Sequence, residues 1–311
     1  MGLPVRVSLR SNFAWTFAGN VVFAAGQWAI LALFAKLDSS EMLGQYALAV
    51  AIATPAVMLF HLNLRAVLAT DAGAKYPFGD YVAVRFTTAA VGLIAIAVLA
   101  CVGGHSRALA ATILLSGLSQ TADTVSDIYY GAMQRRERMD QIAWSMLARS
   151  VLPVAALGAV LFRTHDIVAA VAALALGRVA VLLAYDRRAG SAGERLNRTG
   201  LSAQMSILRT ALPLGLVLML ASLNANLPRY AIESQLGLRE LGAFTAVASL
   251  GNVGSTVVNA LGQTAMPRLA LYCRERNWPR FRQLVAELTG LTLLLGVSGI
   301  VAAAVLGRIV L

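Results

Sequence analysis

Charged side chains are scarce in this chain of 311 residues: only 13% are Asp, Glu, Lys or Arg, whereas 58% are hydrophobic. A soluble domain has about a quarter charged residues, so this composition excludes an ordinary soluble protein. Several apolar runs of roughly 20 residues are each long enough to cross the hydrocarbon core of a bilayer. The runs are continuous and do not alternate, which excludes a membrane β-barrel. The sequence therefore predicts an all-α, polytopic transmembrane helical bundle.

Cysteine and histidine are also rare, and neither is arranged for chemistry. Cys101 lies in an apolar run and Cys273 in a basic loop, a setting that indicates neither a disulfide nor a metal site. The histidines, His61, His105 and His165, are far apart and lack the spacing of metal ligands. The sequence has no phosphate-binding glycine loop, nucleophile elbow or dinucleotide-binding glycine pattern. We therefore expect no enzyme activity, no cofactor and no metal.

Acidic residues are outnumbered by basic ones, 15 to 26, which gives a formal net charge of +11. We predict about nine spans, at approximately 13–35, 44–66, 83–104, 107–131, 142–162, 166–184, 208–228, 240–264 and 284–306. With the amino terminus and alternate loops assigned to the cytoplasm, 20 Lys and Arg residues lie on that side and six on the other. Basic residues favour the cytoplasmic side, so the amino terminus is predicted to be cytoplasmic. This topology explains the excess charge, and no nucleic-acid partner is expected.

The longest polar stretch, residues 185–207, is rich in Arg, Gly and Ser and predicts a flexible cytoplasmic linker. It separates a six-helix amino-terminal bundle, residues 1–184, from a carboxyl-terminal bundle of three helices, residues 208–311. A faint repeat crosses it, because Leu43-Gly-Gln-Tyr46 resembles Leu241-Gly-Ala-Phe244 at an offset of 198 residues. Many transporters are built from such repeats. If the halves are equivalent, the second bundle is incomplete and the chain is about three helices short.

Six short motifs, in order between about residues 10 and 285, resemble those of a known family. They are Asn12–Trp15 (followed by Gly19-Asn20 and Gln27-Trp28), Glu41–Ala49, Leu64–Asp71, Tyr130–Met139, Asn226–Tyr230 and Gly262–Ala270. The chain resembles the bacterial oligosaccharide flippases, also called polysaccharide biosynthesis or O-antigen translocase proteins. These belong to the multidrug/oligosaccharidyl-lipid/polysaccharide exporter superfamily.

The resemblance implies two bundles of six helices around a central cavity. It also implies translocation of undecaprenyl-pyrophosphate-linked oligosaccharide across the bacterial inner membrane by alternating access, for polysaccharide, lipopolysaccharide or O-antigen synthesis. The implied partners are this lipid-linked oligosaccharide, membrane lipids, and polysaccharide polymerase and glycosyltransferase proteins. Family members usually have twelve or more helices. Two alternatives stay open: a non-transporting scaffold or inactive remnant of such a flippase, and a small-molecule antiporter of the same superfamily.

Polar side chains inside the predicted spans are the candidate functional residues, because charges in a membrane are costly and mark substrate paths. The predicted substrate-binding residues are Arg149, Arg178, Arg65, Arg229, Asn224 and Asn226. A guanidinium is planar and permanently charged, and therefore suits a pyrophosphate. Arg65 could instead snorkel to the cytoplasmic headgroups, and Arg229 could pair with Glu233. Their deeper positions favour Arg149 and Arg178 over Arg65.

Asp123 and Asp127 are four residues apart and therefore lie on one face of the fourth predicted helix. One interpretation is a structural ion pair between Asp127 and Arg149 that ties two helices together. The other is a carboxylate that couples transport to protons or sodium ions. Spacing alone does not decide between them.

Overall fold

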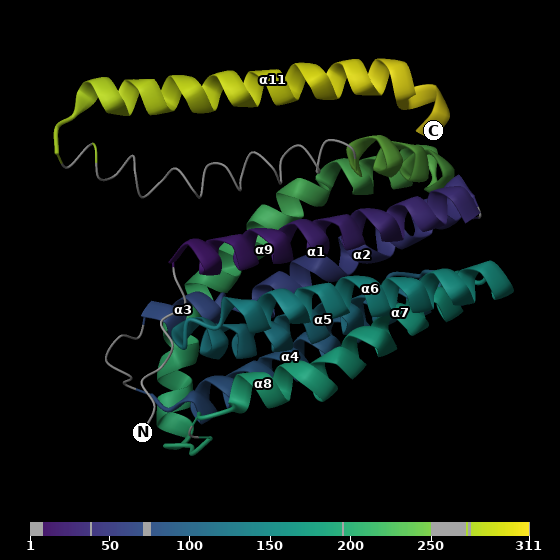
Figure 1. Ribbon diagram of the computed structural model, residues 1–311. Helices are drawn as coiled ribbons and strands as arrows, with labels where there is room; N and C mark the ends of the chain where they lie inside the picture. Colours follow the sequence, from purple (N-terminus) through teal and green to yellow (C-terminus); the bar gives the residue numbers. More distant parts are fainter. Residues whose placement is uncertain are drawn as a thin grey trace. The chain divides into compact units, whose positions relative to one another are not determined.

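The computed structural model describes residues 9–37, 39–70, 76–194, 196–249, 272 and 275–310, and every regular element in these ranges is helical (Figure 1). The elements are α1 (Leu9–Leu37), α2 (Ser40–His61), α3 (Leu64–Thr70), α4 (Phe78–Val102), α5 (Arg107–Arg135), α6 (Met139–Thr164), α7 (Ile167–Val181), the π-helical turn η1 (Leu182–Asp186), α8 (Arg187–Ser191), α9 (Leu201–Leu236) and α11 (Trp278–Val310). Residues 238–249 are also helical. The predicted all-α class is confirmed.

Six helical segments within the described residues are long and apolar enough to cross a membrane. They are Ala14–Leu37, Ser40–Leu68, Phe78–Val102, Met139–Thr164, Ile167–Ser191 and Leu201–Leu236, and they correspond to six of the nine predicted spans. The fourth predicted span forms α5, which is too polar to meet the same criterion. Most of the eighth predicted span lies outside the described residues, and the ninth lies within α11.

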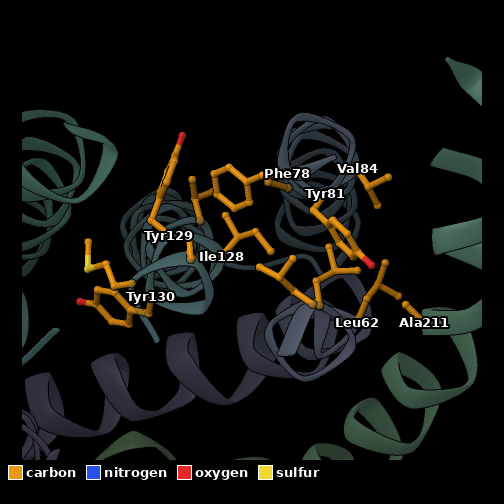
Figure 2. Packing of buried hydrophobic residues seen from close by; sticks show 14 of the residues in the cluster. Leu62, Phe78, Tyr81, Val84, Ile128, Tyr129, Tyr130 and Ala211 are labelled. Atoms are coloured by element: carbon orange, nitrogen blue, oxygen red, sulfur yellow. The ribbon is translucent and has the colours of Figure 1, made fainter. Parts of the chain in front are cut away.

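The polar helix α5 lies at the centre of the first of two compact units, residues 1–243 and 244–311. It packs against α2, α4 and α7, while α1 packs against α6 and α9 against α2. Near its carboxyl end, α5 contributes Ile128 and Tyr129 to a core that includes Phe78 and Tyr81 of α4 (Figure 2). The Phe78 and Tyr129 rings meet edge to face with their centroids 6.1 Å apart. Since other helices surround α5, its polar side chains can face protein rather than lipid.

A break between α2 and α3 determines the direction of Arg65. Leu62 and Asn63 both have left-handed backbone conformations, with φ angles of 54° and 46°. Such a conformation ends a right-handed helix, so α2 stops at His61 and α3 begins at Leu64. The buried Leu62 side chain joins the core (Figure 2). The break therefore holds His61 and Arg65 at one end of the bundle.

The part of the 185–207 stretch that the structure describes is attached to α4. Residues 187–191 are helical, and α9 begins at Leu201. The buried Asp80 carboxylate at the start of α4 accepts a hydrogen bond from the Thr199 amide at 3.1 Å and another from the Thr199 hydroxyl. Tyr76 and Ser206 are also hydrogen-bonded, at 2.9 Å. The division of the chain into two bundles and a linker stays a prediction.

The two copies of the sequence repeat touch each other. Gly44 near the start of α2 packs so closely on Leu238 that a Cβ atom there would overlap the Leu238 carbonyl oxygen. A Cβ atom on Gly242 would likewise overlap the Ser40 carbonyl oxygen. These pairs are equivalent under the repeat, because 238 − 40 and 242 − 44 both equal 198. The contact is therefore reciprocal, as expected at a local two-fold axis.

Candidate functional site

A cavity of about 390 Å³ lies inside the first unit, between α1, α2, α3, α5, α6 and α7. Arg65, Arg149 and Arg178 line it together with Asp123 and Asp127. Five of the eight candidate residues predicted from sequence therefore line one cavity. The other lining residues are Phe23, Gln27, Tyr46, Val50, Val57, Met58, His61, Ser116, Ser119, Gln120, Thr124, Tyr130 and Met146.

A polar stripe along α5 forms one wall of this cavity. Ser116, Ser119, Gln120, Asp123, Thr124 and Asp127 all line the cavity. Their spacing of three or four residues places them on one face of the helix, over about 16 Å of its length. This stripe explains why α5 is the least apolar of the expected spans. The sequence signal was present, but only Asp123 and Asp127 were identified from it.

Asp123 is the centre of a buried ion-pair network. Arg149 of α6 donates to one of its carboxylate oxygens, and Nη1 of Arg178 of α7 donates to the other at 2.6 Å. Arg149 also reaches the Asp186 carboxylate, with an Nη1–Oδ2 distance of 3.4 Å. Two guanidinium groups and two carboxylates thus neutralise each other. The network ties α5, α6, α7 and η1 together.

The predicted ion pair between Asp127 and Arg149 is therefore wrong. Arg149 pairs with Asp123, one helical turn away from Asp127 on the same face of α5. The two carboxylates share that face, so spacing could not show which one lies level with Arg149. The relative axial position of α5 and α6 decides the partner.

Asp186 was missed because the sequence placed it in the predicted linker. It is fully buried in η1, and its carboxylate accepts hydrogen bonds from Ser126 at 2.6 Å and from Ser145. A π-helical turn changes the register of the side chains that follow it. The available signal was that residues 179–185 continue the apolar run to Asp186 without Gly or Pro.

A second cluster surrounds Asp127 at the α2–α3 break. His61 Nε2 lies 3.3 Å from one Asp127 oxygen, and Arg65 Nη1 lies 3.1 Å from the other. Arg65 also donates to Gln134 at 3.0 Å, and its guanidinium carbon lies 5.8 Å from the centre of the Tyr130 ring. Arg65 therefore faces the cavity and does not extend along the helix surface to the headgroups.

Arg85 of α4 is a buried charged residue that was not among the candidates predicted from the sequence. Its side chain is fully buried, and Nη1 donates to the Phe60 carbonyl oxygen at 3.3 Å. Nε and Nη2 have no hydrogen-bond partner among the residues that the structure describes. Phe60, the partner of Arg85, precedes His61, whose Nε2 lies 3.3 Å from an Asp127 oxygen.

The remaining three candidates lie on α9, away from this cavity. Arg229 Nη1 donates to Asn226 Oδ1 at 2.5 Å, so its described partner is Asn226 rather than Glu233. Asn224 is exposed. The neighbouring Tyr230 hydroxyl donates to the Ala51 carbonyl oxygen of α2 at 2.5 Å. A substrate role for this group stays a prediction.

Comparison with known proteins identifies the family. Residues 9–272 match the family described as polysaccharide biosynthesis protein. The chain belongs to this family. A curated relative, the capsular polysaccharide biosynthesis protein CapF of Staphylococcus aureus, is 23% identical over 303 residues, which are 96% of this chain and 76% of the relative.

Solved structures of similar fold are transporters of the MOP superfamily. One comes from Pyrococcus furiosus; it has a TM-score of 0.60 and 13% identity, over 98% of this chain and 74% of the transporter. An outward-facing multidrug resistance transporter of the MATE family has the same TM-score, identity and coverage. The chain is therefore a multi-pass membrane protein. Its fold is that of these transporters.

Proposed function

We propose that this polysaccharide biosynthesis family protein translocates undecaprenyl-pyrophosphate-linked oligosaccharide from the cytoplasmic to the outer leaflet of the bacterial inner membrane. The main observation that supports this proposal is a cavity lined by arginines and hydrogen-bonding side chains, inside a helical membrane protein of this family. A glycan needs many hydrogen-bonding partners, and its pyrophosphate needs cations. The cavity supplies both kinds of group. The name of the relative CapF supports a polysaccharide as the end product.

Transport follows from unequal affinity for the substrate in two states. A ligand shifts a conformational equilibrium only as far as it binds one state better than the other. Guanidinium groups in a low-dielectric cavity bind a pyrophosphate strongly, because charge-assisted and bidentate hydrogen bonds are the strongest available. A change in the access of the arginines between an inward-open and an outward-open state would provide the difference. In this proposal the amino terminus is cytoplasmic.

Asp123 and Asp127 have a structural role in this proposal. Asp123 neutralises Arg149 and Arg178, and Asp127 holds Arg65 at the cavity wall. A role of either carboxylate in proton or sodium coupling is the alternative. Polysaccharide polymerase and glycosyltransferase proteins are the proposed protein partners, since they consume and supply the lipid-linked glycan.

A flipping assay in proteoliposomes tests the function. The protein is expected to move a fluorescent undecaprenyl-pyrophosphate-linked oligosaccharide to the opposite leaflet, where a membrane-impermeant quencher distinguishes the leaflets. A neutral glycolipid with the same sugar should not be moved, because it lacks the pyrophosphate. Failure to move either lipid, by protein shown to be folded, would contradict the proposal and favour the scaffold interpretation. Movement of a cationic dye alone would favour the antiporter.

Variants of the cavity residues test the mechanism. Arg149→Ala and Arg178→Ala are expected to reduce flipping strongly while the protein still inserts into the membrane, because either change leaves the Asp123 carboxylate in the cavity wall with only one described guanidinium partner. Arg163→Ala is the matched control, because Arg163 is exposed at the end of α6. Undiminished flipping by both cavity variants would refute the role of these arginines.

A further inference from the structure

The two ion clusters of the cavity have different charge balances. Around Asp123, the guanidinium groups of Arg149 and Arg178 face two carboxylates, so the charges cancel. Around Asp127, the Arg65 guanidinium pairs with a single carboxylate. The buried Arg85, which donates to the carbonyl oxygen of Phe60 beside His61, adds a second guanidinium that pairs with no carboxylate among the described residues. The positive excess of the cavity therefore lies at the Asp127 cluster.

The arginines of the two clusters also differ in their exposure, and the more exposed one belongs to the Asp127 cluster. The exposed fractions of the Arg149 and Arg178 side chains are 2% and 5%, whereas that of Arg65 is 28%. An anion that enters the cavity can reach Arg65 without opening the core of the bundle. Reaching Arg149 or Arg178 would require separating them from Asp123. Separating a buried pair leaves an uncompensated charge and is strongly unfavourable.

Arg85 is the second arginine beside this cluster, and part of its guanidinium group is unsatisfied. A buried N–H group without a hydrogen-bond partner is costly, and a charged one more so. Arg85 has two such groups, Nε and Nη2, with no partner in the described part of the chain. It reaches Phe60, the residue before His61, and His61 and Arg65 occupy the two Asp127 oxygens. Arg85 is therefore placed to bind Asp127 once Arg65 leaves it.

We infer that Arg65 binds the phosphate or diphosphate group of the ligand, and that Arg85 then takes over the Asp127 carboxylate that Arg65 releases. Arg85 acts as a positioning residue: it compensates the Asp127 charge while Arg65 is engaged. In the unliganded state Asp127 competes with the anion for Arg65. The lipid-linked origin of the diphosphate rests on the proposed function, whereas recognition of the diphosphate does not.

The test is the affinity of the purified protein in nanodiscs for inorganic pyrophosphate, measured by titration calorimetry. Arg65→Gln is expected to weaken binding by at least about tenfold, since it removes a charge-assisted contact. Asp127→Asn is expected to strengthen binding severalfold, because it removes the competitor. Arg163→Gln, the exposed control on α6, should stay within about twofold of the unmodified protein. Absence of pyrophosphate binding, unchanged binding by Arg65→Gln or weaker binding by Asp127→Asn would each overturn the inference.

A double variant separates the positioning role of Arg85 from a merely structural one. Arg85→Gln alone is expected to weaken pyrophosphate binding about tenfold, because Asp127 then keeps Arg65. In the Asp127→Asn background the same change should have little effect, since no carboxylate is left to compensate. Equal weakening in both backgrounds would overturn the partner exchange. If Arg85→Gln does not fold, the sign of the change in affinity in Asp127→Asn still decides whether Asp127 competes with the anion for Arg65.

Competition by undecaprenyl pyrophosphate distinguishes this inference from the proposed function. If the lipid in the same nanodiscs competes with pyrophosphate, and Arg65→Gln abolishes both interactions, the lipid headgroup occupies the site. If pyrophosphate binds as expected but the lipid does not compete, the site binds a soluble anion. The anion site would then be supported and the proposed function contradicted.

Discussion

Removal of the Asp123 carboxylate is the most direct test of the buried network. In Asp123→Ala, the 3.4 Å contact with Asp186 would be the one carboxylate contact left to Arg149 among the described residues. Arg178 would keep a 3.5 Å hydrogen bond to the neutral Gln27. One guanidinium charge would therefore be left inside the bundle without a carboxylate partner among the described residues.

The structure indicates that Asp123→Ala has a large effect on the free energy of unfolding. Removing one partner of a buried ion pair costs about 3–5 kcal/mol, because the other charge stays buried and uncompensated. We expect Asp123→Ala to lower the free energy of unfolding by this amount, since the two arginines that it holds are almost completely buried. The matched control is Asp140→Ala. Asp140 pairs with Arg138 at 2.9 Å, but the exposed fractions of these side chains are 31% and 48%, and such surface pairs contribute about 0–1 kcal/mol.

Equilibrium unfolding in mixed detergent micelles, followed by tryptophan fluorescence, measures both variants. The double variant Asp123→Ala/Arg178→Met should recover about 1–3 kcal/mol relative to the sum of the single effects, because it also removes the uncompensated charge. A loss in Asp123→Ala no larger than that in Asp140→Ala would refute the argument. Additive single effects would show that Asp123 and Arg178 are not coupled.

Three further changes test other parts of the molecule. Gly44→Val should separate the reciprocal helix contact, because a Cβ atom there would overlap a facing carbonyl oxygen; thiol labelling of a cysteine introduced nearby should become faster, and unchanged labelling would contradict the close approach. Ser126→Ala should lower the free energy of unfolding by about 1–3 kcal/mol, because the buried Asp186 loses a hydrogen bond; a loss below this range would indicate that water replaces the hydroxyl. Asp80→Ala should accelerate hydrogen exchange at the Thr199 amide, and exchange at the wild-type rate would show that this contact does not hold the segment.

Much of the candidate site could be predicted from charged residues in apolar runs. Arg65, Arg149, Arg178, Asp123 and Asp127 were identified in this way, and all five line one cavity. These residues could be identified because a charge inside a membrane is costly and is kept where it has a role. That cost does not depend on the arrangement of the helices.

The depth of an arginine within its predicted span did not show which arginine is available to bind an anion. Depth favoured Arg149 and Arg178, but the structure neutralises both with Asp123. Arg65 was expected at the rim, yet the break after α2 turns it into the cavity beside Asp127. Depth describes distance from the membrane surface, whereas anion binding depends on the net charge and access of a cluster.

The amino-acid sequence by itself determined that this protein is a helical membrane protein, because the length and continuity of apolar runs decide whether a segment can span a bilayer. The order of its motifs also indicated the family, which residues 9–272 confirm. Only the tertiary structure decided which carboxylate meets which arginine and which charges are left in excess. Those pairings depend on the axial positions and rotations of neighbouring helices, and the periodicity of a single helix contains neither.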